Sequence, residues 1–177
     1  SDLLAIKNGL KTTDVFNQYV DIATLGTIAD VVPLLGENRV IVDKGLKILH
    51  NPKRIGIRAV MEVAGVLDKP LSASTIAFSI APRLNAAGRL GSAATAVELL
   101  LTNDESRARE LALLLDTENK ERQQTERQIF DEALELIAKD PNFEKKKVIV
   151  LAQENWHQGV IGIVASRLCD MYYKPCI

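Results

Sequence analysis

The chain has 177 residues, of which 47% are hydrophobic and 25% are charged, a composition typical of a folded globular protein rather than a disordered one. Its formal net charge of −1 provides no overall basic field, so any nucleic-acid contact must come from local arginines. Since it has no signal segment and no long apolar run, we expect no membrane association and a cytoplasmic location.

Helical periodicity and capping residues predict five helices in roughly the first hundred residues. Thr13 or Asp14 is expected to cap the first helix, Asn38 the second, Ser72 or Ser74 the fourth and Ser92 the fifth, while Gly65 ends the third. The fourth is expected to lead into a corner at Pro82 and Arg83. In chain order, the five cover about 13–26, 38–50, 57–64, 72–80 and 92–100.

A sixth helix is predicted from about Asp104 to Lys139, because no glycine or proline occurs before Pro141. At 1.5 Å per residue it would be about 50 Å long. Thirteen consecutive residues in its middle, 116–128, include none that is apolar. We therefore expect an exposed middle and buried ends; the alternative is two helices with a loop between them. The residues expected to be buried are Leu111 and Leu115 at one end and Phe130, Leu134 and Ile137 at the other.

After Pro141 the pattern changes to a β-branched run at 148–151, which is typical of a buried strand. A polar loop, a helix to about Tyr172 and a second strand from Lys174 are expected to follow. This order predicts the beginning of an α/β domain, so the expected fold class is α/β overall with a mostly helical first part. Cys169 and Cys176 form no CxxC pair, which argues against a zinc site or a disulfide framework.

The segment APRLNAAGRL at 81–90 places Arg83, Asn85 and Arg89 among small residues. Small residues let a backbone or a ligand come close, and the planar guanidinium groups suit phosphate oxygens. One alternative is a tight, alanine-rich turn with two solvated arginines. Another is that Arg89 pairs with a local acid and only shapes the loop.

Two further segments, DIATLGTIADVVPL at 21–34 and WHQGVIGIVASRL at 156–168, flank this one. In this order, the three segments resemble the RecJ-type exonucleases of the DHH phosphoesterase superfamily, and the resemblance covers nearly the whole chain. It implies a hydrolase that degrades single-stranded DNA in the 5′→3′ direction with Mn²⁺ or Mg²⁺. It leaves two alternatives: a DHH phosphoesterase of small nucleotides, or an inactive RecJ-like interaction module.

The Asp-x-Asp and Asp-His-His motifs that the family carries upstream of the first segment are absent, and so is its Gly-Gly-His motif. We therefore expect an internal fragment of a longer enzyme. By resemblance, residues 1–103 would be the C-terminal part of the DHH catalytic domain and 104–140 a connecting helix. Residues 141–177 would begin the DHH-associated nucleic-acid-binding domain.

The resemblance also implies roles for single residues in the first two motifs. Asp30 would be the last of the metal ligands, with Asp21 as the second choice. From its chemistry alone, a residue such as Asp30 is more often a helix cap or a buried hydrogen-bond acceptor than a metal ligand. Arg83 would meet the DNA near its 5′ end, Asn85 would orient it, and Arg89 would bind phosphate in the cleft.

By resemblance, the domain that contains the third motif binds nucleic acid. His157 is a candidate contact because it lies at the start of the predicted helix, and helix starts attract anions. Ser166 and Arg167 are candidates because they lie two turns further along and would grip a phosphate. Trp156 would either stack on a base or pack in the core. His157 is not expected to be a general base, since the metals of the family already activate the water.

Overall fold

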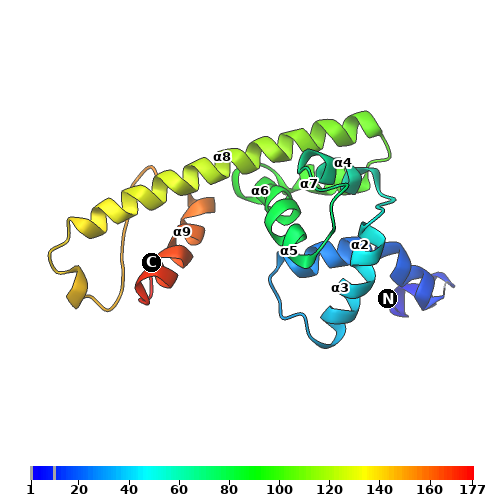
Figure 1. Cartoon of the computed structure of the whole chain (residues 1–177), viewed down its shortest axis with the longest axis horizontal. Coiled ribbons are helices and arrows are strands. Elements are labelled where there is room, and N and C mark those ends of the chain that lie inside the picture. Colours follow the sequence, from blue (N-terminus) through cyan, green and yellow to red (C-terminus); the bar gives the residue numbers. More distant parts are fainter. Residues whose placement is uncertain (1, 10) are drawn as a thin grey trace.

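The structure, a computed structural model, describes residues 2–9 and 11–177. Most of these residues are helical, and Figure 1 shows two groups of helices joined by the long helix α8, with the N-terminus in one group and the C-terminus in the other. The elements are α1 (Asp2–Asn8), α2 (Thr12–Ala29), α3 (Gly36–Leu49), α4 (Ile55–Val63), α5 (Ala73–Thr75), the π-helical turn η1 (Ile76–Ile80), α6 (Ala81–Leu90), α7 (Ala93–Leu101), α8 (Glu105–Ala138), the 3₁₀ turn η2 (Phe143–Lys145) and α9 (Gln158–Tyr172).

The caps predicted at Ser72, Ser92 and Gly65 are confirmed, whereas the one predicted at Thr13 or Asp14 is not, because α2 already begins at Thr12 and Lys11 is its N-cap residue. The Ser72 side chain accepts a hydrogen bond from the Thr75 amide, and Ser92 accepts one from Ala94. Gly65 has a φ of 68°, as expected after a helix end. The prediction for Asn38 was wrong: α3 begins two residues earlier, at Gly36, and the Asn38 side chain instead donates to the Pro33 carbonyl.

The segment 81–90 is a helix, so neither a corner nor an alanine-rich turn occurs there. Helix α5, the turn η1 and α6 follow one another without a break, and the Ala81 amide donates to the carbonyl of Ile76, five residues earlier. A proline inside a helix removes a hydrogen bond and crowds the carbonyl four residues before it. The wider π-helical turn directly before Pro82 accommodates the proline within a continuous helix.

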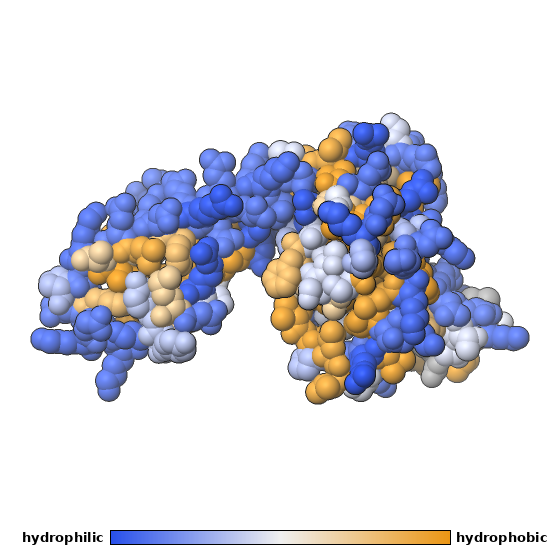
Figure 2. All heavy atoms as spheres, viewed as in Figure 1, coloured by the Kyte–Doolittle hydropathy of each residue, from blue (hydrophilic) through white to orange (hydrophobic). Residues whose placement is uncertain are grey.

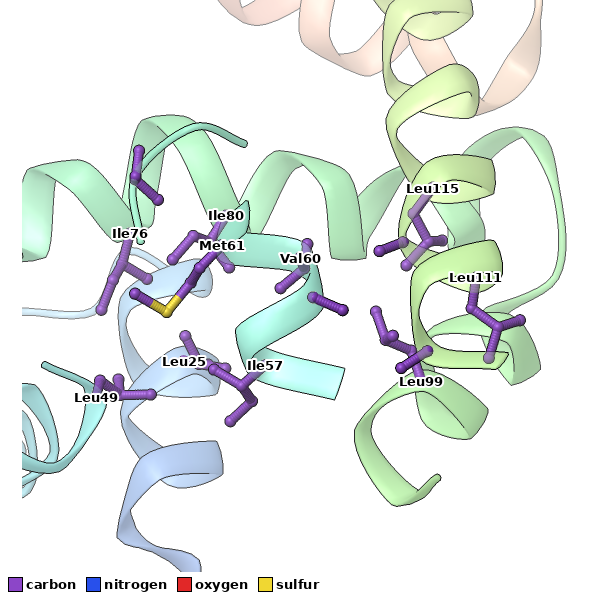
Figure 3. Close-up of a cluster of buried hydrophobic side chains, with 14 of the residues drawn as sticks. Leu25, Leu49, Ile57, Val60, Met61, Ile76, Ile80, Leu99, Leu111 and Leu115 are labelled. Atoms are coloured by element: carbon purple, nitrogen blue, oxygen red, sulfur yellow. The ribbon is translucent and has the colours of Figure 1, made fainter. Parts of the chain in front are cut away.

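Helices α2 to α7 and the first half of α8 share one hydrophobic core (Figure 3). The labelled side chains in Figure 3 converge from α2, α3, α4, η1, α7 and α8. Full burial of each large apolar side chain contributes about 1.5–3 kcal/mol. The largest of these that are almost completely buried are Leu49, Ile57, Val60, Met61, Ile76, Ile80, Leu99 and Leu115.

The second half of α8 packs with α9 in a separate C-terminal core. Its buried residues are Ile129, Phe130, Ala133, Ile137, Phe143, Ile149, Val160, Val164 and Leu168. The predicted strands at 148–151 and from 174 are reduced to one parallel bridge between Ile149 and Cys176. The prediction of an α/β class overall is therefore not confirmed in the described part of the chain. Two short extended segments pair only with each other there, and this is too little for a sheet.

The long helix is confirmed. Helix α8 has 34 residues, and the Asp104 carboxylate caps it by accepting from the Arg107 amide at 3.0 Å. The expected exposed middle is correct for only one face, because Asp116 and Asn119 are 7% and 2% exposed. The small residues of α6 let that helix lie against the inner face of α8, which buries these two side chains. No helix in the described ranges is apolar enough over a sufficient length to cross a bilayer.

Candidate functional site

The three sequence motifs meet at one open pocket of about 670 Å³. The end of α2 contributes Asp30, α6 contributes Asn85 and Arg89, and the first turn of α9 contributes Gln158. The other lining residues are small: Gly26, Ala29, Gly88, Gly159 and Gly162. The helices around this pocket border the hollow that lies under α8 between the two groups of helices in Figure 2. The site therefore combines residues that are distant in sequence and belong to both groups.

Asp30 lies at the C-terminal end of α2, where its exposed carboxylate faces the pocket. A negative charge is unfavourable at this end of a helix, because the helix dipole is also negative there. The next residue, Val31, has a φ of 55°, a left-handed conformation that is strained for a β-branched side chain. Within the described ranges, the Asp30 carboxylate forms no ion pair. Asp30 is the C-cap residue of α2, and its exposed side chain is not the buried acceptor that the sequence left open as an alternative.

Asp21, in contrast, is a buried residue whose carboxylate is hydrogen-bonded within the fold. It is 6% exposed; one carboxylate oxygen accepts from the Ile22 amide at 2.8 Å and the other from Arg54 Nε at 2.9 Å. Both oxygens are thus engaged in the fold, and Asp21 borders a different pocket, beside Arg54. This arrangement favours Asp30 over Asp21 as the functional carboxylate.

The described residues do not by themselves fit a metal centre. They contain no group of three or more His, Cys, Asp or Glu side chains that could hold an ion. Mg²⁺ and Mn²⁺ need several oxygen or imidazole ligands, and the pocket offers one carboxylate, Asp30. A metal at this place would need further ligands from outside the described residues.

Arg89 and Asn85 are exposed on the pocket side of α6. Arg89 Nη1 donates to the Gly159 carbonyl at 3.1 Å, which ties α6 to the start of α9. Across the described ranges, Arg89 is in none of the ion pairs, so the alternative of a local acid partner is not observed. The rest of its guanidinium is available for phosphate oxygens.

Arg83 points to α8 rather than to the pocket. Its Nε and Nη2 atoms lie 2.9 and 2.8 Å from Asp116 Oδ1, and Nη1 donates to the Ser79 carbonyl. Lys120 Nζ lies 2.8 Å from the other Asp116 oxygen. Burial raises the pKa of Asp116, but the hydrogen bond from Lys120 and the charge of Arg83 lower it more, so the pKa lies below its ordinary value. This ion-pair group holds α6 on α8.

The start of α9 touches α6 directly. His157 is the N-cap residue of α9, and its Nδ1 atom accepts from the Gly159 amide at 3.1 Å. A Cβ atom at Gly159 would lie 2.4 Å from the Arg89 carbonyl oxygen, so only glycine allows this approach. Gln158 is a pocket residue that the sequence analysis missed; its position beside His157 in the third motif was the available signal.

The remaining candidates lie further along α9. Ser166 is exposed, and Arg167 contacts α8: its Nη1 atom lies 3.0 Å from Glu126 Oε1, and its guanidinium carbon is 4.0 Å from the Phe130 ring centroid. The packing interpretation of Trp156 is confirmed, because it lies against the C-terminal core and donates to Glu132 at 2.7 Å.

Comparisons with known proteins show which chains this one resembles. The single-stranded-DNA-specific exonuclease RecJ of Bacillus subtilis is 41% identical over 161 residues, which are 91% of this chain and 20% of the relative. The same-named protein of Haemophilus influenzae is 44% identical over 170 residues, or 94% of this chain and 30% of the relative. The crystal structure of RecJ from Thermus thermophilus in complex with Mg²⁺ superimposes with a TM-score of 0.84 at 39% identity.

Over nearly its whole length, the chain is similar to RecJ exonucleases. That Thermus structure covers 98% of this chain, while the chain covers 26% of it. A structure of exonuclease RecJ bound to manganese matches with a TM-score of 0.82, and the chain covers 42% of it. No family model matches the chain. The chain spans between 20% and 30% of the length of the curated RecJ relatives it matches.

Proposed function

We propose that the protein containing this chain is a metal-dependent exonuclease that hydrolyses single-stranded DNA in the 5′→3′ direction. The RecJ relatives are named single-stranded-DNA-specific exonucleases, and solved RecJ structures carry Mg²⁺ or Mn²⁺. The observation that carries the proposal is the convergence of the three motifs on one pocket, which Asp30, Asn85, Arg89 and Gln158 all line.

In this proposal, Arg89 binds a phosphate and Asn85 orients the strand beside it. Asp30 is one ligand of a Mn²⁺ or Mg²⁺ site whose other ligands come from outside the described residues. His157 and Ser166 of α9 contact the strand further along. Arg83 and Arg167 were also predicted from the sequence as DNA contacts. Their partners in this structure are acids of α8, so we assign strand binding to the other four residues, Asn85, Arg89, His157 and Ser166.

The domain assignment is part of the same proposal. Residues 1–103 belong to the C-terminal part of the catalytic DHH domain, and residues 141–177 begin the DHH-associated domain. Residues 104–140 form the helix that connects the two domains. The order of bridge segment, α9 and second bridge segment supports an α/β beginning, since a parallel pair joined by a helix is the unit of such domains.

The test uses the full-length protein with 5′- or 3′-labelled single-stranded and duplex DNA, in Mn²⁺, Mg²⁺ or chelator. We expect mononucleotides from the 5′ end of the single strand, and none with chelator. Cleavage from the 3′ end only, or turnover of dinucleotides alone, would contradict the proposal.

The variant Asp30→Ala tests the carboxylate. Loss of a metal ligand raises the barrier by several kcal/mol, so we expect a rate lower by about 100-fold or more, with single-strand binding nearly intact. Asp68→Ala, at an exposed residue away from the pocket, is the control and should keep the full rate. An Asp30 variant with unchanged turnover at saturating Mn²⁺ would remove Asp30 from the metal site.

A further inference from the structure

We infer that Arg167 is a positioning residue: together with Glu126 it fixes the tilt of α9 on α8 and so holds the first turn of α9 against the pocket. The inference deepens the proposed function, because the first turn of α9 contributes Gln158 and Gly159 to the proposed DNA site. It gives Arg167 a role other than that of a phosphate ligand.

The contacts of Arg167 reach α8 in two ways. One nitrogen forms the 3.0 Å ion pair with Glu126, and the guanidinium lies over the Phe130 ring, which is one helical turn beyond Glu126 on α8. An ion pair and a cation–π contact from one planar group are both directional. Arg167 is therefore held in place by two neighbouring residues of α8.

Glu126 is itself held firmly. Its second oxygen, Oε2, lies 2.7 Å from Arg122 Nη1, so both carboxylate oxygens are engaged. Arg122 also donates to the buried Asn119 side chain. The side chains of Glu126 and Arg122 are only 16% and 11% exposed, which limits screening by water. A fixed carboxylate can set the position of the helix that binds it.

The tilt of a helix is defined when it is held at two separate points along its length, and α9 is held near its start and again at Arg167. Near its start, Gly159 touches the Arg89 backbone and its carbonyl accepts from Arg89. Arg167 lies eight residues further along, or about 12 Å at 1.5 Å per residue. Between these points, Val160 and Val164 bury apolar surface, which favours contact but specifies no direction. The polar contact at Arg167, together with the hydrogen bond from Trp156 to Glu132 just before α9, thus fixes the angle at which Gln158 and Gly159 meet α6.

The experiment compares Arg167→Ala, Glu126→Gln and the double variant in the full-length protein. If both residues act through one contact, each single variant should raise the KM for single-stranded DNA about 5-fold, and the double variant no further. The dependence of log K on log salt should keep its slope, because no phosphate contact is lost. Hydrogen exchange of the amides at 159–163 should become faster by a similar factor in all three variants.

Glu135→Gln is the matched control, because Glu135 also lies on α8 and forms an ion pair, but only with Lys139 of the same helix. It should change neither KM nor exchange. Phe130→Leu removes the aromatic ring under Arg167 and keeps an apolar side chain, so it should reproduce part of the rise in KM and of the faster exchange. It replaces Glu126→Gln in the comparison if that variant does not fold.

Two results would overturn the inference: a slope flattened by about 0.7 in Arg167→Ala alone, as for a lost phosphate contact, or a Glu126→Gln variant identical to the wild type. The exchange measurement needs no nuclease activity. A protein without exonuclease activity would thus refute the proposed function, while exchange would still decide whether Arg167 positions α9.

Discussion

Arg83 and Arg89 are six residues apart on α6 and lie in opposite environments. Arg83 forms a largely buried ion pair with Asp116, whereas Arg89 is exposed in the pocket. Removing Arg83 leaves Asp116 with Lys120 alone, so Arg83→Ala should cost about 3 kcal/mol of unfolding free energy. Arg89→Ala should leave that free energy nearly unchanged. It should make the slope of log K for single-strand binding against log salt concentration less negative by about 0.7.

Urea unfolding of both variants and DNA titrations of the full-length protein at several salt concentrations measure the two effects. Equal stability of the two variants would contradict the assignment of Arg83 to the fold. A flattened slope for Arg83→Ala would assign Arg83 a phosphate contact in addition.

Glu118 is the one described residue with a buried side-chain oxygen, Oε2, that has no hydrogen-bond partner. Its other oxygen lies against the backbone of Gly91, where an added Cβ would be 2.3 Å away. Burial raises the pKa of Glu118 above its ordinary 4.5, and the charge of Glu121 raises it further. A carboxyl with a raised pKa favours the folded state when protonated, so this contribution is lost as the pH rises through the raised pKa.

Glu118→Gln should therefore raise the melting temperature of the chain at pH 7 to 8, because the uncompensated charge is gone. The gain over the wild type should shrink as the pH falls towards about 4.5, where Glu118 is protonated. Thermal unfolding at a series of pH values measures it. A gain that is the same at every pH would show that charge is not its cause.

At the scale of elements, two glycines of α9 should respond to alanine with opposite signs. Gly162 has open space where a Cβ would lie, and alanine there should stabilise the helix by about 1 kcal/mol. A methyl at Gly159 would overlap the Arg89 carbonyl, so α9 must shift, at a cost of about 1–3 kcal/mol. Thermal unfolding of Gly159→Ala and Gly162→Ala compares the two, and the same sign in both would contradict the contact between α6 and α9.

Local signals predicted the helices well, because a cap or an apolar stripe depends on residues only a few positions apart. Ser72, Ser92 and Asp104 cap helices as expected, and α8 is continuous. The π-helical turn and the buried polar face of α8 could not be predicted in this way, because they depend on how distant elements pack. The same holds for Arg83 and Arg167, whose acid partners lie 33 and 41 residues away in sequence.

For the site, residues of all three motifs line one pocket in the structure. Asp30, Asn85 and Arg89 were chosen from sequence, and the structure brings all three to one pocket. Their chemical roles stay predictions. The direct contact between Gly159 and α6 was not foreseen, since a glycine after a loop is compatible with many local conformations.

At the scale of the whole molecule, the chain has two hydrophobic cores, joined by α8 and by the contact of α6 with α9. Among the described residues, only Asp30 offers a carboxylate to the pocket that the two groups of helices share. We therefore expect residues 1–177 alone to release no labelled mononucleotide in Mn²⁺, because one carboxylate cannot hold two hard cations. Release above a no-protein control would show that the described residues suffice for catalysis.

The π-helical turn at Ile76–Ile80 determines which way the side chains of α6 face around the helix axis. An α-helix advances about 100° per residue, so one residue more or less before Pro82 would rotate α6 by that angle about its axis. Arg83 would then leave Asp116, and Asn85 and Arg89 would leave the pocket, although every chemical group would still be present. Substitutions in η1 can be absorbed by repacking, but a change in its length cannot. A relative that lacks this wide turn would need a compensating shift elsewhere in the rod formed by α5, η1 and α6.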